Sequence, residues 1–235
     1  KELSQLHLRD TFKPRHPDKL TKEQKEEALE SHLFLKEKRD SSIKARMVAG
    51  GDKQRGTMPA IEASSPTVST DAVMITATIE AIEERDVGSI DIPNAYSSTR
   101  IENEKDKAIV RLRGKLAELM VLVAPEIYRP YIIVNRNGET VLYVEILNVL
   151  YGILKGAILF YKRLTRDLCS IGFEINPYDP CVANKMIGGY QMTLTWHVDD
   201  MKISHKDPRA VGDMIDWLKS IYETILADGE GAMTV

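Results

Sequence analysis

Three short turns, each close to stretches rich in β-branched and aromatic residues, constrain the fold of this chain more than any other feature. They are centred on the pairs Asn137-Gly138, Gly188-Gly189 and Asp199-Asp200. Asn-Gly between two β-prone runs is a strong hairpin signal, because both residues tolerate a positive φ. Hairpins join antiparallel strands. The sequence therefore predicts antiparallel sheets and argues against a doubly wound parallel sheet.

Helical and extended patterns alternate along the rest of the chain. Apolar residues at three- and four-residue spacing predict helices over residues 22–38, 70–84, 116–123, 157–171 and 208–226. Strands are expected over residues 43–49, 87–92, 107–113, 131–134, 140–144, 180–187, 190–196 and 201–204. Residues 1–20 are interpreted as an extended lead-in, and the helix over 70–84 is expected to be mostly buried. Together these elements predict an α+β fold.

Composition narrows the class of protein. The chain has 235 residues, of which 43% are hydrophobic, enough for one large domain or two smaller lobes with real cores. A formal net charge of −3 means that nucleic-acid binding would depend on local patches and bound cations. The two cysteines lack CxxC spacing, which argues against a zinc site or a disulfide framework and fits a reducing compartment.

Neither a membrane-spanning segment nor a signal peptide at the start is expected from the sequence. No apolar run approaches the roughly 20 residues that span a bilayer, and the polar segment Lys1–Asp10 does not resemble a signal peptide. The chain begins without Met and stops at Val235 without a helix-ending signal. We therefore expect a fragment of a longer polypeptide.

Three aspartates form the strongest candidate for a chemical site. Asp199 and Asp200 would lie at a hairpin tip, and Asp91 ends an apolar run just before Pro93. Adjacent carboxylates repel each other unless a cation shares them, and Mg²⁺ prefers carboxylate oxygen. Three carboxylates can hold two ions about 3.5–4 Å apart for in-line phosphoryl displacement. The residue types alone leave open a solvated Asp-Asp turn and a helix N-cap at Asp91.

Six segments carry recognisable motifs in a fixed order: Lys44–Gln54, Glu62–Val68, Ser89–Tyr96, Leu150–Tyr161, Asn176–Val182 and His197–Met201. They resemble motifs of copia-type retrotransposon reverse transcriptases, and the resemblance runs from about residue 22 to 227. The last segment resembles the Tyr-Val-Asp-Asp-Met box with His in the Tyr place. The third segment resembles the first metal motif, Asp-Val-x-x-Ala-Phe.

The chain departs from the family pattern at three places. Ser97-Ser98-Thr99 stands where Leu-Asn-Gly is common, Ala157-Ile158 replaces Pro-Arg, and Gly50 stands where Lys or Arg is usual. The three aspartates are retained. The departures therefore concern nucleotide and template contacts rather than the carboxylates.

The resemblance implies a right-hand polymerase palm, an antiparallel sheet with packed helices, together with a fingers subdomain. Residues 1–86 and 104–148 would be fingers-like, and residues 87–103 and 149–235 palm-like. The thumb, ribonuclease H and integrase domains would be absent from this chain. The implied location is the cytoplasm, with virus-like particles as one setting.

The resemblance also assigns the metal site. Asp91, Asp199 and Asp200 would be catalytic and would hold two Mg²⁺ ions, for which Mn²⁺ can substitute. The carbonyl of Ile92 would add a further ligand. Tyr96 would be the aromatic steric gate that excludes a 2′-hydroxyl, and its alternative is a plain core aromatic.

The remaining implied contacts are to nucleotide and template. Lys44 and Arg46 would hold the incoming triphosphate, although two solvated strand cations are the alternative reading. Gly152 would let backbone approach the nucleotide closely, and Lys155 would lie beside it.

The resemblance implies addition of deoxynucleotides from deoxynucleoside triphosphates to a DNA primer on an RNA or DNA template, within a longer Pol polyprotein. The isolated chain is expected to bind primer and template poorly and to polymerise weakly if at all. Backbone contacts would hold the template, so binding should weaken with salt. Two alternatives remain: a non-catalytic remnant that keeps the palm fold, and a metal-dependent nuclease or phosphatase. The second does not explain Tyr96 or the basic hairpin at Lys44 and Arg46.

Overall fold

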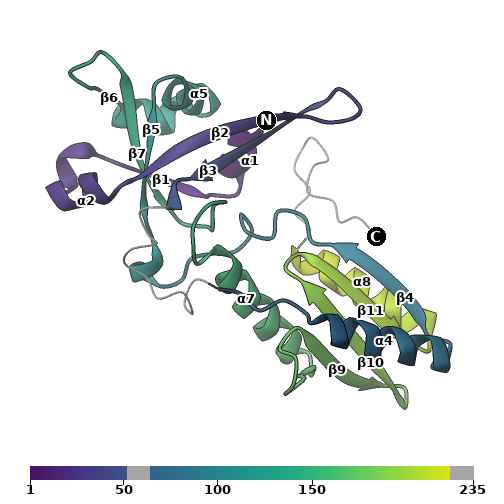
Figure 1. Cartoon of the computed structure of the whole chain (residues 1–235). Coiled ribbons are helices and arrows are strands. Elements are labelled where there is room, and N and C mark those ends of the chain that lie inside the picture. The colour runs from purple at the N-terminus through teal and green to yellow at the C-terminus, as the bar shows by residue number, and fades with distance from the viewer. Residues whose placement is uncertain (52–63, 223–235) are drawn as a thin grey trace. The chain divides into compact units, whose positions relative to one another are not determined.

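The computed structural model describes residues 1–51 and 64–222, which form two compact units (Figure 1). The first unit comprises Lys1–Ala63 and Tyr96–Gly156, and the second comprises Ser64–Ala95 and Ala157–Val235. Residues 52–63 hold the end of the Lys44–Gln54 motif and the start of the Glu62–Val68 motif, and they lie outside the described residues. The predicted helix beyond residue 222 lies outside them too.

The first unit is a sheet with short helices. Its helices are α1 (Glu2–Leu8), α2 (Lys22–Glu27), α5 (Lys115–Val123) and α6 (Pro125–Tyr128), with single 3₁₀ turns η1 (Pro17–Lys19), η3 (Glu104–Asp106) and η4 (Arg129–Tyr131). Its strands are β1 (Phe12–Arg15), β2 (Leu29–Glu37), β3 (Ile43–Ala49), β5 (Ile109–Arg113), β6 (Ile133–Val134) and β7 (Thr140–Ile146).

The strands of the first unit follow the order β1-β7-β5-β2-β3, and β6 pairs with β7. All of these pairs are antiparallel except β2 with β5. The central strands β5 and β7 supply fully buried side chains, including Val110, Leu112, Leu142 and Val144. The core of this unit therefore lies on the middle of the sheet, and the β2–β3 hairpin projects past it (Figure 1).

Two predictions for the first unit are wrong. The helix expected over residues 22–38 ends at Glu27, and Leu29–Glu37 forms strand β2. The capping box at Thr21 and Gln24 is present, so the start of the helix is confirmed. The second error is the extended lead-in, because residues 1–20 contain α1 and β1. In both places pairing or packing with distant residues decides the outcome, since β2 pairs with β3 over Ser31–Glu37 and with β5 at Leu29 and Glu30.

The second unit contains a five-stranded antiparallel sheet in the order β4-β11-β10-β9-β8. Its strands are β4 (Asp86–Asp91), β8 (Glu174–Ile175), β9 (Val182–Ile187), β10 (Tyr190–His197) and β11 (Asp200–His205). Its helices are α4 (Thr70–Glu83), α7 (Gly156–Ser170) and α8 (Pro208–Tyr222). The two predicted hairpins in this region, β9–β10 and β10–β11, are confirmed.

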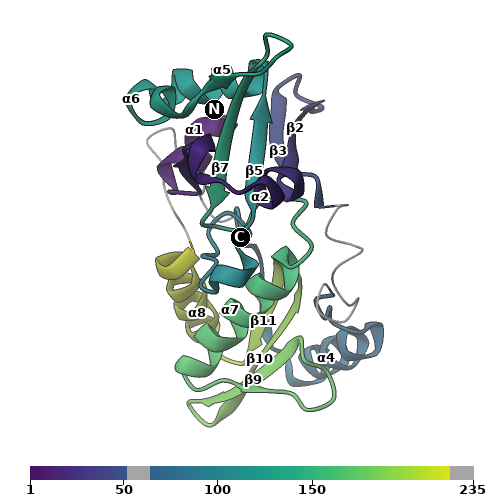
Figure 2. The same cartoon turned by 90° about the vertical axis from the view of Figure 1, so that its left-hand side faces the viewer.

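Helices cover both faces of the second sheet, with α7 and α8 on one side and α4 on the other (Figure 2). A Cβ on Gly88 would lie 3.1 Å from side-chain atoms of Val211 and Ile215, so α8 packs closely on β4. The Tyr222 hydroxyl donates to the Asp167 carboxylate at 2.7 Å, which joins α8 to α7. The apolar core of this unit lies between the sheet and these two helices.

Helix α4 contacts the opposite face through polar groups. The Lys202 ammonium pairs with the Glu80 carboxylate at 2.9 Å and donates to the Thr76 hydroxyl at 3.1 Å. Met74 and Ile82 are 64% and 77% exposed. The expectation of a mostly buried helix is therefore wrong, because the sheet face beneath α4 is polar.

The α+β fold class is confirmed, with an antiparallel sheet in the second unit and a largely antiparallel one in the first. The expected division put residues 64–86 in the first part and residues 96–103 and 149–156 in the second. The observed boundaries differ at each of these segments. Residues 64–86 include α4, which packs on the second sheet, and Ile101 donates to the Leu147 carbonyl within the first unit. Across residues 1–51 and 64–222, no helix has the length and apolar character needed to cross a membrane.

Candidate metal and nucleotide site

The Asp-Asp pair lies at the tip of the β10–β11 hairpin, as predicted. His197 and Asp200 face each other as the last strand pair, so Val198 and Asp199 form a two-residue turn. Val198 has a φ of 60°. A β-branched residue with positive φ is an outlier, and such strain costs about 1–3 kcal/mol. The fold keeps a strained residue next to two carboxylates, a combination that occurs at functional sites more than elsewhere.

Strand β4 brings Asp91 beside this tip. Asp91 is the last residue of β4 and pairs in register with Asp200, the first residue of β11. The Ile92 amide donates to the Asp199 carbonyl at 3.0 Å, which extends the pairing by one more bond. Residues after Asp91 form turns rather than a helix, so the N-cap interpretation of Asp91 is excluded.

The carboxylates of Asp91 and Asp200 lie on one face of the sheet, because directly paired residues of antiparallel strands share a face. Both residues are exposed. His197 on β10 pairs with Asp200 and so lies on the same face of the sheet. Like charges directly opposite each other destabilise a sheet. Lys202, the nearest cation along β11, is committed to Glu80 on α4. A bound cation would therefore relieve a repulsion that the strand register creates.

The donor chemistry of this end of the sheet fits a hard divalent ion. Mg²⁺ is commonly held by one or two carboxylates, with water and substrate phosphates as its other ligands. The described residues contain no group of three or more His, Cys, Asp or Glu side chains arranged to hold a metal ion. The structure thus brings Asp91 and Asp200 to facing positions, with Asp199 in the adjoining turn, and any metal site would need substrate oxygens to complete it.

Asp179 joins two segments next to this hairpin, a role that the sequence did not indicate. The Asp179 carboxylate is buried and accepts from the backbone amides of Ser69, at 2.8 Å, and Cys181, at 2.9 Å. Burial alone would raise the pKa of Asp179, but these two amides hold that pKa below its ordinary value. Burial, with the Asp179 charge nearby, raises the pKa of the Cys181 thiol to about 12. Asp179 therefore ties the start of α4 to the start of β9, the neighbour of β10.

The β2–β3 hairpin of the first unit carries Lys44 and Arg46, both exposed. The Arg46 guanidinium carbon lies 4.1 Å from the centroid of the Tyr151 ring, within the range of a cation–π contact. Lys44 pairs in register with Lys36, so two like charges face each other on this hairpin. Arg46 thus contacts an aromatic ring while remaining exposed, and triphosphate binding by Lys44 and Arg46 stays a prediction.

Tyr96 lies in the same unit and meets the same ring. The Tyr96 and Tyr151 ring centroids are 5.1 Å apart with an interplanar angle of 69°, an edge-to-face pair. Both residues are half-buried. Tyr96 is thus a partly accessible aromatic side chain and not a fully buried core residue.

Gly152 and Lys155 have structural partners in the first unit. Gly152 has a φ of 89°, and a Cβ there would lie 2.0 Å from the Ala49 carbonyl oxygen, so glycine is required by the fold itself. The Lys155 ammonium pairs with the Asp106 carboxylate at 2.7 Å, and both side chains are largely buried. Contacts of either residue with a nucleotide remain a prediction.

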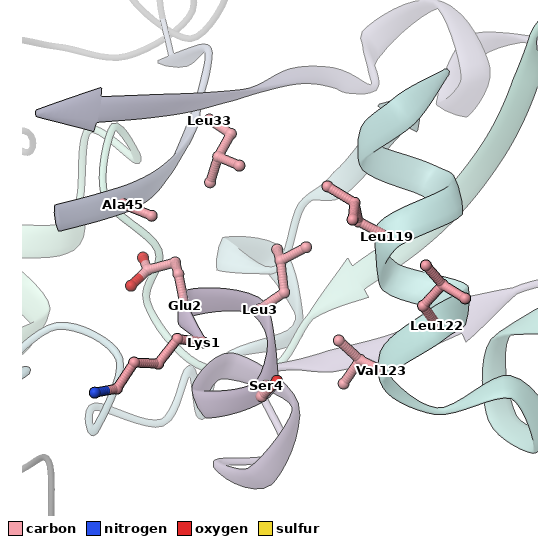
Figure 3. A pocket seen from close by; sticks show the side chains of 9 residues that line it. All are labelled: Lys1, Glu2, Leu3, Ser4, Leu33, Ala45, Leu119, Leu122 and Val123. Carbon is pink, nitrogen blue, oxygen red and sulfur yellow. The ribbon is translucent and has the colours of Figure 1, made fainter. Parts of the chain in front are cut away.

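A cavity of about 420 Å³ opens on the other face of the β2–β3 hairpin (Figure 3). It is lined by Lys1, Glu2, Leu3, Ser4, Leu33, Ala45, Leu119, Leu122 and Val123. Successive residues of a strand point to opposite faces. Ala45 therefore faces the cavity, whereas its neighbours Lys44 and Arg46 face away from it. None of the predicted site residues lines this cavity.

Comparison with known proteins identifies one family. The family described as "Reverse transcriptase (RNA-dependent DNA polymerase)" matches residues 20–227, nearly the whole chain. No curated protein matches the chain. A solved structure of telomerase from Candida albicans in complex with a fragment of telomeric RNA is similar at 12% identity and a TM-score of 0.40. That match covers 96% of this chain and 45% of the telomerase chain, so this chain spans less than half of that protein.

Proposed function

This chain belongs to the reverse transcriptase (RNA-dependent DNA polymerase) family, and we propose that it is the fingers-and-palm part of a copia-type retrotransposon enzyme. It would add deoxynucleotides to the 3′-hydroxyl of a DNA primer on an RNA or DNA template. The first unit would supply the fingers and the second the palm. The motifs from Lys44 to Met201 and their order support the copia assignment.

The register of β4 against β11 carries this proposal. It places the Asp91 carboxylate opposite that of Asp200, with Asp199 in the turn between β10 and β11. An isolated Asp-Asp turn would need no third carboxylate from a separate strand. Paired acidic residues at the end of a sheet, beside a strained turn, suit phosphoryl transfer better than a structural role.

The proposed metal site has four donors. Asp91 and Asp199 would share two Mg²⁺ ions, for which Mn²⁺ can substitute, and Asp200 and the Ile92 carbonyl would complete the set. When bound, these ions supply activation of the primer hydroxyl and neutralisation of the triphosphate charge. The side chains of this chain contribute by holding negative oxygen atoms at fixed places along two paired strands.

The transfer itself exchanges one phosphorus–oxygen bond for another. The primer 3′-oxygen forms a bond to the α-phosphorus of the deoxynucleotide, and the bond from that phosphorus to the bridging oxygen breaks. Pyrophosphate leaves, and the hydroxyl proton passes to water. Lys44 and Arg46 would bind the triphosphate, and Gly152 and Lys155 would lie beside the nucleotide. The Tyr96 ring would fill the space that a 2′-hydroxyl needs.

Partners follow from the same chemistry. The template would be held through its phosphates, so its binding should weaken as salt concentration rises. The remainder of a Pol polyprotein would supply the thumb and ribonuclease H functions. We propose a cytoplasmic location, with virus-like particles as one setting.

A non-catalytic remnant that keeps only the fold is the second candidate. One observation favours it. Within residues 1–51 and 64–222, no group of three Asp, Glu, His or Cys side chains is arranged to hold a metal ion. A remnant would retain nucleic-acid binding through the basic hairpin but would not extend a primer. The two candidates therefore differ in whether Asp91, Asp199 and Asp200 are needed for primer extension.

Primer extension separates the two candidates. The chain is incubated with a DNA primer on an RNA template, deoxynucleotides and Mg²⁺ or Mn²⁺, and the single-nucleotide extension rate is measured. Replacing Asp199 by Asn should lower that rate by about 100- to 1000-fold, the usual scale for losing one electrostatic contact in a transition state. Asp216→Asn, which changes an exposed carboxylate on α8, should leave the rate unchanged. Equal rates in all three proteins would refute the enzyme assignment.

A further inference from the structure

The Tyr151 ring lies between two residues to which the proposed function gives separate tasks. It contacts the Arg46 guanidinium at 4.1 Å from its centroid and the Tyr96 ring at 5.1 Å between centroids. Arg46 comes from the β2–β3 hairpin and Tyr96 from the turn after Ala95. Tyr151 therefore connects a triphosphate-binding cation to a sugar-sensing ring through side-chain contacts alone.

The backbone of Tyr151 is fixed against β3. Its carbonyl accepts from the Ala49 amide at 2.8 Å, and Tyr151 forms a parallel bridge with Val48. The chain turns away at once through Gly152, with a φ of 89° and no room for a Cβ next to the Ala49 carbonyl. The position of the Tyr151 ring is thus set by strand pairing and by a glycine that nothing larger can replace.

The turn that carries Tyr96 is fixed against the segment leading to Tyr151. The Thr99 amide donates to the Tyr96 carbonyl at 2.8 Å, and the Val149 amide donates to the Thr99 carbonyl at 2.9 Å. The buried Asn148 side chain donates to the Ser97 carbonyl at 3.0 Å. Both ends of the Tyr96–Tyr151 contact are therefore anchored by backbone hydrogen bonds, and the ring pair has little freedom to separate.

We propose that Tyr151 is a positioning residue for sugar discrimination. Its ring holds the Tyr96 ring in the orientation that excludes a 2′-hydroxyl, and it also holds the Arg46 guanidinium over its own face. The inference rests on the proposed function, because it concerns the nucleotide that the polymerase would accept. An edge-to-face ring pair has a preferred angle that an aliphatic side chain cannot impose. A steric gate works only if its ring cannot turn aside. The contact of Tyr151 with Tyr96 should therefore set the preference for deoxynucleotides over ribonucleotides.

The test compares two substrates that differ in one hydroxyl group. For the full chain, kcat/KM is measured for incorporation of deoxyadenosine triphosphate and of adenosine triphosphate opposite the same template base. Tyr151→Leu should lower the ratio of the two values by about 3- to 10-fold, the fold-change that corresponds to one aromatic pair. The loss should come mainly from faster ribonucleotide incorporation. Tyr151→Phe, which keeps the ring, should hold the ratio within about 2-fold.

A double-mutant cycle shows whether Tyr151 acts through the gate. In a Tyr96→Ala background the ratio should already be low, and adding Tyr151→Leu should leave it unchanged. A simple packing role would instead lower both kcat/KM values together and leave their ratio intact in every background. Thermal melting of each variant checks that the fold is retained. If Tyr151→Leu unfolds, Tyr151→Met, which removes the ring but keeps a long side chain, carries the test with the same expected fall in the ratio.

The outcomes separate the inference from the proposed function. If the wild-type chain extends the primer and prefers the deoxynucleotide, but Tyr151→Leu does not change the preference, the inference is overturned while the polymerase assignment stands. If the wild-type chain extends the primer with neither nucleotide, the polymerase assignment fails and the inference falls with it. A changed ratio in Tyr151→Leu and an unchanged one in Tyr151→Phe would support both.

Discussion

The two regions that the proposed function needs are built in different ways. In the second unit, Asp91 and Asp200 face each other because two strands pair in register, and backbone hydrogen bonds alone fix that relation. In the first unit, Arg46, Tyr151 and Tyr96 meet through ring and guanidinium contacts between three separate segments. We therefore expect the position of the acidic region to be insensitive to changes of its side chains, whereas the arrangement of the aromatic cluster should depend on the Tyr151 ring that both other members contact.

This difference determines where each region is vulnerable. A strand register shifts only if a whole sheet reorganises, because a slip by one residue moves every side chain to the other face. The contacts of Tyr151 with Arg46 and Tyr96 would be lost if the backbone that supports one of these side chains moved. Mutations of supports should therefore damage the first unit more than the second, whereas mutations of the carboxylates should remove activity and leave folding intact.

Gly152→Ala should cause the largest loss of stability. The new Cβ would lie 2.0 Å from the Ala49 carbonyl oxygen, and the residue would keep a φ that disfavours alanine. We expect the free energy of unfolding to fall by about 4 kcal/mol, measured by urea titration. Gly138→Ala is the matched control, because Gly138 has a φ of 76° and nothing within 4 Å, and should cost about 1 kcal/mol. Equal losses would mean that the close approach to Ala49 is absent in solution.

Asp179→Ala should cost about 2 kcal/mol, because it leaves the buried amide of Cys181 and the part-buried amide of Ser69 without their acceptor. The pKa of Asp179 is lowered in the folded state. Its contribution is therefore present above the unfolded pKa of about 3.9 and is lost as pH falls through the lower folded pKa. Urea titrations at several pH values should show the gap between wild type and variant closing below about pH 4. If the difference in unfolding free energy between wild type and variant grew at acid pH, the pKa of Asp179 would be raised in the folded state and not lowered.

Val198→Gly should stabilise the protein by about 1 kcal/mol. Val198 has a φ of 60° in the tight turn beside Asp199, and glycine adopts that φ without strain. Val134→Gly, at an exposed position of strand β6, is the control and should cost about 0.5–1 kcal/mol. The midpoint of thermal unfolding should rise for the first variant and fall for the second. A fall in both would show that the turn is not strained.

Arg46→Met should have the smallest effect, a loss of about 0.5 kcal/mol, because an exposed cation–π contact is weak. Arg39→Met, at the tip of the same hairpin, should change stability by less. The comparison needs several repeated urea titrations, since the difference is close to their error. A loss well above 1 kcal/mol would mean that the aromatic cluster is stronger than its exposed geometry indicates.

Local signals predicted much of the second unit. The Gly188-Gly189 turn and the alternation on either side of it gave the β9–β10 hairpin, and Gly172, with a φ of 88°, ends α7 as a C′ glycine would. Pro208 begins α8, as expected of proline in a first turn. These features depend on neighbours in sequence, which is why residue types alone were sufficient.

The first unit was predicted less well, because its elements depend on distant partners. Leu29, Leu33 and Leu35 fit a helical stripe, yet strands β3 and β5 together offer this segment strand pairing along its length. The short helix α1 buries Leu3 and Leu6, and the sequence signal for so short a helix is faint. Tertiary pairing decided both segments against local propensity.

The candidate site shows the same limit. Residue types and the family resemblance gave Asp91, Asp199 and Asp200, but only the strand order reveals that β4 lies next to β11 and puts Asp91 opposite Asp200. No sequence pattern indicated that Tyr151 would touch both Arg46 and Tyr96. Side-chain contacts between separate segments have no local signature, so the aromatic cluster could be found only in three dimensions.

The proposed function requires that the acidic end of the second sheet binds a divalent ion together with a nucleotide. Calorimetric titration of the chain with Mn²⁺ in the presence of deoxyadenosine triphosphate tests it most directly. The account predicts measurable heat of binding for the wild type and for Asp216→Asn, with none for Asp91→Asn or Asp199→Asn. Indistinguishable binding curves in all four proteins, or no binding to the wild type, would contradict it.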